Sequence, residues 1–458
     1  MKWTIRLEAR TEWGEATSYE IGALRRGIDD LTADGTGLTL CEAKVLLAEL
    51  QRRIVQSQID EYIACARVCA DCTKLRRLRD RRTRRLQTLF GTVTVAAPRI
   101  CICSHALGMG IVDVSFSPLA RLLPDRCTAE LRHLEAELGA RYSFREAARL
   151  LAMFLPGSSP NHASVRNRLH RVASVIEAAE AAPLPPSLDV GRQSDQEEIV
   201  VMIDGAHIRA VPAHPTRHLD VTVGKVETVG RLPRRFALAP TGAEEPAQAV
   251  RAALAAQGWR PGRPVIVISD GEPALPNLVG AATGGPVNHI LDWWHISMRV
   301  RHIEQSLKGI YLLRPKHQAG LDYVSTDVER LRHLIWNGYA TEAHDALWAL
   351  THLASEAIYL NGEHVGPAVR KFLLHCQELR VYLANNDHAL IDYGTRYRAG
   401  VPISSSRAEG SVDEIANARM AKRRRMRWSP RGAHYVVTVR AAVLDGRLQG
   451  LTPARLAA

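Results

Sequence analysis

The chain has 458 residues, of which 46% are hydrophobic and 24% charged, a globular composition that excludes a fibrous or wholly disordered protein. A length of this order favours two to four domains. Lys and Arg number 60 against 48 Asp and Glu, a formal net charge of +12, and this excess favours a polyanionic partner.

The first residues, MKWTIRLEARTEWGE, carry charges that interrupt every apolar stretch, so we expect no signal peptide. No later apolar run is long enough to cross a bilayer. We therefore expect a cytoplasmic, nucleoid-associated protein without a membrane partner.

Residues 1–68 are predicted to form an N-terminal helical region, because apolar residues recur at helical spacing from Thr39 to Arg67. Residues 69–115 are predicted to form a zinc-ribbon-like hairpin. Its proposed ligands for a structural Zn²⁺ are four cysteines: Cys69, Cys72, Cys101 and Cys103. The alternative is buried or redundant thiols, and Cys65 and His105 are possible substitute ligands.

A dense basic block follows the first cysteine pair. Eight of the twelve residues from Lys74 to Arg85 are basic, a pattern typical of a DNA-binding segment. A solvated face or a flexible basic loop is the alternative interpretation. The candidate DNA-binding residues here are Arg76, Arg77, Arg81, Arg82, Arg84 and Arg85.

Residues 116–180 indicate a helix-turn-helix-like region. Its second helix, beginning near His162, carries Arg166, Arg168 and Arg171, which are candidate DNA contacts. A plain helical hairpin fits the pattern equally well. Residues 181–197, rich in Pro, Ser and charge, are predicted to be a linker.

Strand and helix signals alternate over residues 198–298, which predicts the first part of a catalytic α/β domain. Buried strands run into Asp204, Asp270 and Asp292, with antiparallel pairing first and parallel pairing afterwards. Residues 299–397 are predicted to be a helical insertion. Residues 398–458 then supply the last helix and a basic tail, whose candidate DNA-binding residues are Lys422, Arg423, Arg424, Arg425 and Arg427.

Three carboxylates are candidates for chemistry: Asp204, Asp270 and Glu409. The predicted fold class is α/β, a ribonuclease H-like mixed sheet interrupted by an all-helical insertion and preceded by a helical and zinc-ribbon-like DNA-binding region. Such a sheet would bring the two aspartates together, and crowded carboxylates need a cation. We expect two Mg²⁺ or Mn²⁺ ions. The alternative is that all three are turn or helix-cap residues, because Asp-Gly is a common turn dipeptide.

Several sequence blocks, taken in order, resemble DDE-type insertion-sequence transposases of the ISKra type, related to Mutator-like elements. These blocks are VMIDGAHIRA, VISDGE, LDWWHISMRV, YGTRYRAGVPISSSRAEGSV and RMAKRRRMRWSPRGAHYVVTVRAAVLDG. The resemblance covers nearly the whole chain, including the cysteine-rich hairpin and the FSPLARLLP segment.

The resemblance implies a metal-dependent transposase that cleaves DNA at the ends of a mobile element and transfers the strand into target DNA. Asp204, Asp270 and Glu409 match the metal-binding triad, and Asp292 and His295 match a signature that supports the active site or DNA. The implied partner is double-stranded DNA, both element terminal repeats and target. The implied assembly is a homodimer or higher oligomer on DNA.

The sequence departs from the family pattern directly after Glu409, where Gly410 replaces the usual Ser. Asp413 and Glu414, one turn further on, are therefore alternative third ligands. Two rival functions stay open: a domesticated, non-catalytic DNA-binding regulator, and a structure-specific DNA nuclease.

Overall fold

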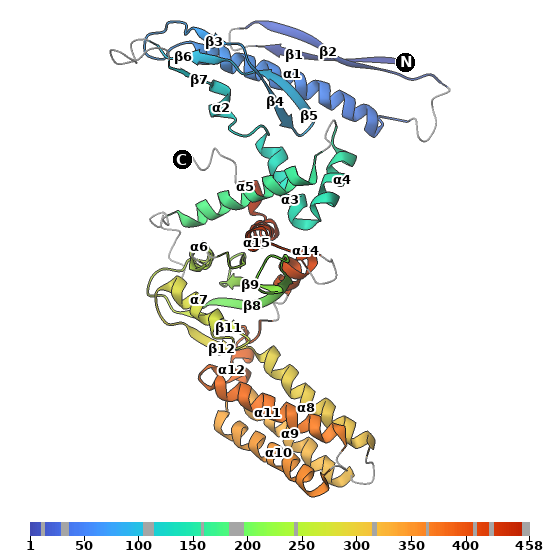
Figure 1. Cartoon of the computed structure of the whole chain (residues 1–458), viewed down its shortest axis with the longest axis vertical. Coiled ribbons are helices and arrows are strands. Elements are labelled where there is room, and N and C mark those ends of the chain that lie inside the picture. The colour runs from blue at the N-terminus through green and yellow to red at the C-terminus, as the bar shows by residue number, and fades with distance from the viewer. Residues whose placement is uncertain are drawn as a thin grey trace. The chain divides into compact units, whose positions relative to one another are not determined.

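The computed structural model describes residues 1–10, 14–28, 36–103, 114–156, 160–182, 197–241, 246–313, 318–362, 366–405, 410–420 and 426–450 (Figure 1). Within it the chain forms two compact units, one of Met1–Val172 with Leu448–Ala458 and one of Ala173–Arg447. No described helix is both long enough and apolar enough to cross a membrane.

The first unit begins with an antiparallel hairpin of β1 (Lys2–Arg10) and β2 (Ala16–Arg25). This differs from the helical region that we predicted for residues 1–68. The reason is visible in the sequence KWTIRLEAR, where apolar and polar residues alternate strictly, which is the period of a strand. Helical structure starts only at α1 (Leu40–Arg67), where the Thr39 side chain caps the backbone N–H of Glu42.

Helix α1 packs on the hairpin of β4 (Thr83–Thr88) and β5 (Gly91–Ala96). Helix positions four residues apart meet alternate strand positions, and together they form one small core: Val55, Ile59, Ile63, Leu86, Val93, Val95 and Leu119. A separate three-stranded sheet has the order β3 (Leu78–Asp80), β6 (Arg99–Cys101) and β7 (Ser115–Phe116). The cysteine-rich segment is thus held between α1 and short strands.

Four helices follow: α2 (Pro118–Leu122), α3 (Ala129–Arg141), α4 (Phe144–Phe154) and α5 (His162–Ala181). Gly139 on α3 allows a close approach to α5, because a Cβ there would lie 3.1 Å from a methyl group of Val165. Ala147, Leu151 and Val165 complete a small core between these helices. The N-terminal part of α5 is therefore fixed against α3 and α4.

The second unit contains a five-stranded mixed sheet in the order β10-β9-β8-β11-β12. Its strands are β8 (Ile199–Arg209), β9 (His218–Glu227), β10 (Arg234–Leu238), β11 (Val265–Ser269) and β12 (Asn288–Leu291). The pairs β8–β9 and β9–β10 are antiparallel, whereas β8–β11 and β11–β12 are parallel. The strand that begins the sheet in sequence is therefore its centre.

Alternate residues of β8 and β11 belong to two different cores. On one face, Ile199, Val201, Ile203, Val265 and Val267 pack with α6 (Ala247–Ala256) and α7 (Ala274–Thr283). On the other face, Val200, Met202, Ile266 and Ile268 pack with the helices that follow β12. The continuous apolar runs of these central strands reflect burial on both faces.

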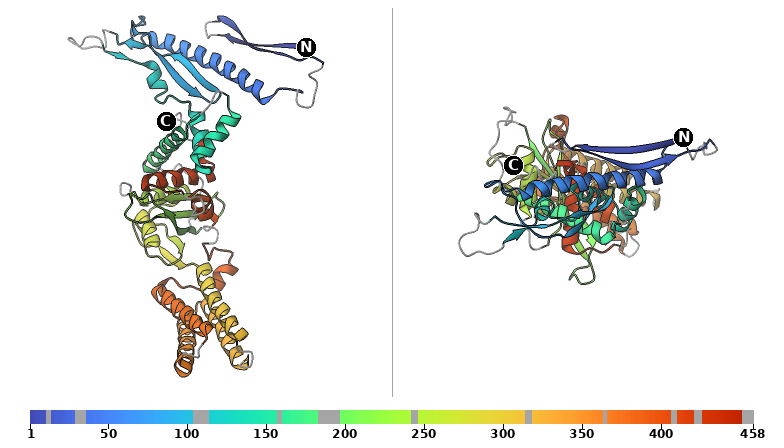
Figure 2. Two further views of the ribbon diagram at one scale, coloured as in Figure 1. Left: turned by 45° about the vertical axis from the view of Figure 1, so that its right-hand side comes forward. Right: turned by 90° about the horizontal axis from the view of Figure 1, so that it is seen from above.

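Those helices are α8 (Trp293–Leu313), α9 (Gln318–Trp336), α10 (Ala340–Asn361) and α11 (Pro367–Asn385), and each packs on the next to form a bundle (Figure 2). The short helices η4 (Asp387–Ala389) and α12 (Tyr393–Arg398) lead back to the sheet. Among the described residues of 299–397 there is no strand.

The C-terminal part of the second unit contains the π-helical turn η5 (Asp413–Asn417), α14 (Ala418–Met420) and α15 (Pro430–Leu444); the 3-10 turn η7 (Arg447–Gly450) follows. Helix α15 packs on β10, and every residue from Ala433 to Val443 is buried. Part of the segment that we predicted to be a basic tail is therefore a core helix. Its VVTV run favours a strand locally, but burial in the unit overrides that preference.

Candidate catalytic and metal sites

Three aspartates stand at equivalent positions on neighbouring parallel strands. The register pairs Met202 of β8 with Ile268 of β11, and Ile268 with Ile290 of β12. Asp204, Asp270 and Asp292 each lie two residues beyond one of these partners, so the same register step brings them to one edge of the sheet. Within β8, Asp204 shares the face of Met202, which is the face covered by the helical bundle, because residues two apart on a strand point to the same side.

We predicted that Asp204 would end its strand, but it lies within β8. The strand continues to Arg209, and beyond Met202 it pairs with β9 alone. The carboxylate accepts a 2.7 Å hydrogen bond from the backbone N–H of Gly205. Burial raises the pKa of Asp204, and the nearby negative charge of Asp270 raises it further. The Asp204 carboxylate is therefore half-buried and within electrostatic range of a second carboxylate.

Asp270 follows β11 in a turn that contacts residues at the end of α11. Its carboxylate accepts a hydrogen bond from the Glu272 backbone N–H at 3.1 Å, and its backbone carbonyl accepts one from the Tyr382 hydroxyl at 2.9 Å. Gly271 has φ +90°, and a Cβ there would lie 2.7 Å from the Asn386 side-chain oxygen. Only glycine suits this backbone position and this close contact.

Asp292 is fully buried, and its carboxylate is saturated. Oδ1 accepts hydrogen bonds from the backbone N–H groups of Trp294 (2.9 Å) and Ser405 (3.1 Å). Oδ2 accepts from the Ser405 hydroxyl (2.5 Å) and from His295 Nδ1 (2.7 Å). A carboxylate offers about four acceptor positions, so Asp292 has none left for a metal ion. Its observed contacts make it an anchor for His295 and for the chain at Ser405.

His295 is in the first turn of α8, bonded to Asp292 and within electrostatic range of the other two aspartates. Burial would lower the pKa of His295, but the hydrogen bond to Asp292 and the charges of Asp270 and Asp204 outweigh it and raise that pKa. Burial likewise opposes ionisation of Asp292, yet the bonds from His295 and Ser405 lower the pKa of that carboxyl. The pair therefore favours a protonated imidazole beside the two half-buried carboxylates.

Glu409, the predicted third ligand, lies outside the described residues. Of its two alternatives, Glu414 has a carboxylate oxygen 3.7 Å from the Arg235 guanidinium, on the edge strand β10. The Asp413 carboxylate accepts a 2.6 Å hydrogen bond from the Asn417 side chain. The carboxylates of both alternative ligands therefore already have a polar partner, Arg235 for Glu414 and Asn417 for Asp413.

A second cluster joins three of the predicted zinc ligands. The Sγ atoms of Cys69, Cys72 and Cys103 all lie within 4.8 Å of one another, and no other set of three ligand groups in the described part of the chain does so. Tetrahedral zinc with bonds of about 2.3 Å would place sulfurs about 3.8 Å apart. The ligand types and their spacing therefore suit a structural zinc ion.

The backbone of the cysteine knuckle is closed by hydrogen bonds from Cys69 N–H to the Lys74 carbonyl and from Thr73 N–H to the Cys69 carbonyl, at 3.0 and 2.9 Å. Thr73 takes a left-handed conformation with φ 56° to make this turn. The backbone N–H of Cys72 lowers the pKa of the Cys69 thiol to about 6, and the Arg76 guanidinium, 3.4 Å from its Sγ, contributes. This thiol is prepared for metal ligation.

Cys101 is not part of the cluster. It ends β6, where its backbone N–H bonds to the Arg77 carbonyl and its register partner is Ser115 of β7, so the sheet holds it apart from the knuckle. The substitute Cys65 is exposed on α1 and is also outside the cluster. The other substitute, His105, lies outside the described residues. Three ligands of the predicted set are thus together.

The predicted DNA-binding arginines divide into engaged and exposed groups. Arg76 contacts Cys69 and the Ala66 carbonyl, and Arg84 donates to the Leu123 and Pro124 carbonyls. The members of the first block that are exposed are Arg77, Arg81, Arg82 and Arg85. The block is therefore part framework and part surface.

Helix α5 shows the same division. Arg168 is paired with the buried Glu135 and bonded to Gln87, so its guanidinium group already has partners within the unit. Arg171 is paired with Asp125 but remains exposed, and Arg166 is exposed beside Asn167. In the tail, Arg427 is exposed next to the end of β8, while Lys422, Arg423, Arg424 and Arg425 lie outside the described residues.

Sequence reasoning missed the residues that fix the aspartates from the bundle. Ser405, Tyr382 and Asn386 make these contacts across 113, 112 and 115 positions of sequence, and the last of these is the side chain packed against Gly271. Ser405 stands in a run of three serines, and Tyr382 occupies an ordinary helical position. No local signal marks them.

No protein-family model and no curated protein matches the sequence. Among solved structures, the chain is similar to the Drosophila P element transposase strand transfer complex, at 10% sequence identity. That match covers 71% of this chain and 93% of the other, with a TM-score of 0.32. A TM-score of this size does not establish a common fold.

Proposed function

We propose that this chain is a DDE-type DNA transposase in which Asp204, Asp270 and Glu409 hold two Mg²⁺ or Mn²⁺ ions. The observation that carries the proposal is the parallel register of β8 and β11, in which Met202 pairs with Ile268 and each aspartate lies two residues further along its chain segment. Asp270 is near enough for its charge to raise the pKa of Asp204, although 66 positions of sequence separate them.

The electrostatics of the two aspartates favour a bound cation. Asp204 is half-buried, and the charge of Asp270 raises its pKa, so the ionised pair is repulsive. Oxygen ligands of this kind suit Mg²⁺ and Mn²⁺. Bound there, such ions activate an attacking oxygen and stabilise the leaving oxygen of a phosphodiester. The chain's own residues must position them and the DNA.

Chain connectivity supports Glu409 as the third ligand. Ser405, four residues before it, donates two hydrogen bonds to Asp292, whose register position adjoins that of Asp270. Four residues span at most about 14 Å. The same segment resumes at Gly410, and the following turn η5 packs on β8 and β9. The described residues on both sides of the segment that contains Glu409 therefore contact the five-stranded sheet or the buried Asp292 beside it.

The arrangement of the sheet supports the ribonuclease H-like part of the proposal. The strands, numbered in sequence order, follow 3-2-1-4-5, with antiparallel pairing in the first three and parallel pairing in the last three. A helical block stands between the last strand and the final helices. Ligand sites of open sheets lie at the carboxyl ends of such parallel strands.

In this proposal His295 is a positioning residue. It holds a proton at Nδ1 toward Asp292, which fixes the ring orientation beside Asp204 and Asp270. The exposed arginines hold the DNA backbone, and two element ends must meet in one event, which requires a dimer or larger assembly. Strand cleavage and strand transfer then use the same carboxylates.

The test is a cleavage assay on a supercoiled plasmid that carries the genomic repeats flanking the coding sequence. Asp204→Asn and Asp270→Asn should each lower Mg²⁺-dependent cleavage by about 10³-fold or more, because each removes a charged metal ligand. The matched control is Asp220→Asn on β9, an exposed aspartate that pairs with His207. DNA binding, measured by fluorescence anisotropy, should be unchanged in all three.

Mapping of the product ends separates the rival functions. Joined products support transposition, whereas nicks without joining indicate a nuclease. Specific binding of the repeats without cleavage by the wild-type chain indicates a regulator. Wild-type cleavage rates in Asp204→Asn would overturn the catalytic assignment outright.

A further inference from the structure

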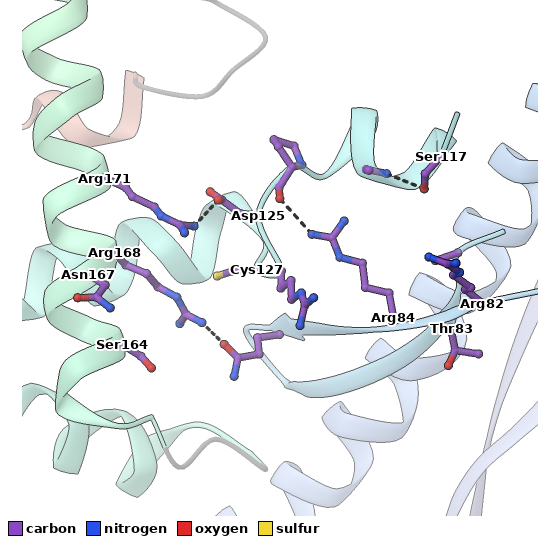
Figure 3. Close-up of a pocket in the computed structure, with 15 residues that line it drawn as sticks. Arg82, Thr83, Arg84, Ser117, Asp125, Cys127, Ser164, Asn167, Arg168 and Arg171 are labelled. Carbon is purple, nitrogen blue, oxygen red and sulfur yellow. Dashed lines mark hydrogen bonds and ion pairs between the residues drawn. The ribbon is translucent and has the colours of Figure 1, made fainter. Parts of the chain in front are cut away.

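The N-terminal unit contains a cavity of about 690 Å³ between β4, the loop after α2, and the first turns of α5 (Figure 3). Its lining includes five arginines: Arg82, Arg84, Arg126, Arg168 and Arg171. Two of these come from the basic block Lys74–Arg85, one from the loop and two from the helix. Segments remote in sequence therefore share one basic cavity.

The acidic residues around the cavity do not neutralise it. Asp125, the one carboxylate in the described lining, is shared by Arg171 and by Arg132, the latter at 2.5 Å. Glu135 pairs with Arg168, and Asp80 pairs with Arg82 at 2.9 Å. Among the residues that the structure describes, six arginines thus meet three carboxylates, an excess of three positive charges.

Two of the guanidinium groups account for two of these three charges, and the third arises because Arg132 and Arg171 share Asp125. Arg84 donates only to neutral groups, the backbone carbonyls of Leu123 at 2.8 Å and Pro124 at 3.1 Å. Arg126 is exposed, and its side chain has no hydrogen-bond or ion-pair partner among the described residues. A guanidinium group held in place by fixed acceptors, as that of Arg84 is, loses little conformational freedom when it binds an anion. The cavity is therefore preorganised at Arg84, and Arg126 adds a positive charge that no described carboxylate pairs with.

The remaining lining points to phosphate rather than to a nucleobase. Thr83, Ser117, Ser164 and Asn167 offer hydroxyl and amide groups, and no aromatic ring is among the described lining residues. Recognition of single bases commonly uses aromatic stacking, whereas backbone contacts use Arg, Ser, Thr and Asn. The chemistry of the cavity matches a phosphodiester backbone.

We propose that this cavity seats the sugar–phosphate backbone of double-stranded DNA, so that the β4–β5 hairpin and α5 bind one DNA segment jointly. The inference rests on the proposed function for the choice of DNA as the polyanion. The sequence predicted two independent DNA-binding elements, a ribbon and a recognition helix. In this proposal they form one composite site. It also adds Arg126, which lies outside both sequence blocks.

The test is the salt dependence of binding by full-length protein to a 30-base-pair duplex in buffer without Mg²⁺, Mn²⁺ or chelator, so that cleavage is not supported and any structural zinc stays bound. Arg126→Gln should weaken binding severalfold at about 0.1 M salt and reduce the slope of log K against log salt by about 1, the effect of one lost phosphate contact. The loss should be equal for unrelated duplex sequences. Arg145→Gln, an exposed arginine of α4 outside the cavity, is the matched control and should change neither quantity.

Arg82→Gln in the hairpin block should reproduce the slope change, and unchanged affinity and slope in both variants would overturn the proposal. A thermal shift by inorganic phosphate or ATP at millimolar concentration that Arg126→Gln removes, with duplex binding intact, would instead show a small-anion site. The proposed function is tested separately. The Arg145→Gln protein should cleave element-end DNA at the wild-type rate and Asp204→Asn should not, and neither result depends on how the Arg126→Gln protein binds DNA.

Discussion

The two candidate metal sites of this chain are built on opposite principles. Asp204 and Asp270 are placed by the parallel register of β8 and β11, inside a sheet whose two faces are buried by separate cores. Cys69, Cys72 and Cys103 are placed by one tight turn and the exit of a three-residue strand, beside a small core. Backbone pairing therefore positions the first site, whereas we expect the second to depend on a bound ion for its order.

This contrast predicts that the two sites respond differently to loss of metal. A cation at the aspartates relieves repulsion but is not needed to hold the strands together. Zinc at the thiolates would supply binding energy that a segment of short strands cannot obtain from its own apolar contacts. The predictions below test this difference, from the largest effect to the smallest.

Removal of zinc should have the largest effect. We expect one zinc ion per chain, and its chelation, or Cys72→Ser, should remove hydrogen-exchange protection from residues 69–103, because structural zinc contributes about 10 kcal/mol in small metal domains. The five-stranded sheet should keep its protection. The measurement combines elemental analysis with hydrogen–deuterium exchange.

Cys41→Ser, an exposed cysteine of α1, is the control and should keep the zinc. If the wild-type protein is metal-free and residues 69–103 are nevertheless protected, the comparison between the two sites fails.

Asp292→Ala should cost about 3 to 5 kcal/mol of unfolding free energy, because it removes one partner of a buried charged network. Loss of its four hydrogen bonds leaves His295, Ser405 and the Trp294 backbone N–H without their acceptor. Asp220→Ala, an exposed change on β9, should stay within about 0.5 kcal/mol. Urea unfolding measured in EDTA compares the two variants.

The same network predicts the pH dependence of that loss. The lowered pKa of Asp292 gives stability that is present above about pH 4 and is lost as pH falls through the lowered value. The raised pKa of His295 gives stability that is present below about pH 6.5 and is lost as pH rises through the raised value. The difference between wild type and Asp292→Ala should therefore be larger at pH 5 than at pH 9; equal differences would exclude the charged pair.

Tyr382→Phe and Tyr393→Phe form a matched pair with the smallest expected effects. Each removes a hydroxyl that donates to a strand-end carbonyl, that of Asp270 at 2.9 Å and that of Leu291 at 2.8 Å. Both should cost about 1 kcal/mol of stability. Only Tyr382→Phe should also slow DNA cleavage, by about tenfold, because its partner belongs to a proposed metal ligand. Equal rates in the two variants would show that the bundle supports the fold alone.

Most strands of the five-stranded sheet could be predicted from the sequence, because strands buried on both faces appear as continuous apolar runs. The strands ending near Asp270 and Asp292, and the helices after them, lie close to where the pattern placed them. Asp204 was assigned to a strand end, yet its strand continues to Arg209 because β9 keeps pairing after β11 stops. Strand length is set by a partner, which periodicity within one strand cannot reveal.

Other parts were beyond sequence reasoning for physical reasons. The roles of Ser405 and Asn386 depend on contacts across more than a hundred residues, and nothing in their immediate neighbours encodes those contacts. The separation of Cys101 from the thiolate cluster follows from its pairing in β6, not from cysteine spacing. The β1–β2 hairpin, in contrast, was encoded by a strict alternation that the prediction of a helical region overlooked.

The connection at Asp292 has an evolutionary consequence. The chain leaves the sheet at Trp293 and returns 113 positions after Asp292, where Trp293 N–H meets the Ile403 carbonyl and Ser405 binds the Asp292 carboxylate. Doubling the length of such an excursion costs only about 0.6 kcal/mol of closure entropy. A helical insertion of another size could therefore replace the present one between Asp292 and Ser405. It would still have to present a hydroxyl to the Asp270 carbonyl and a small polar group against Gly271.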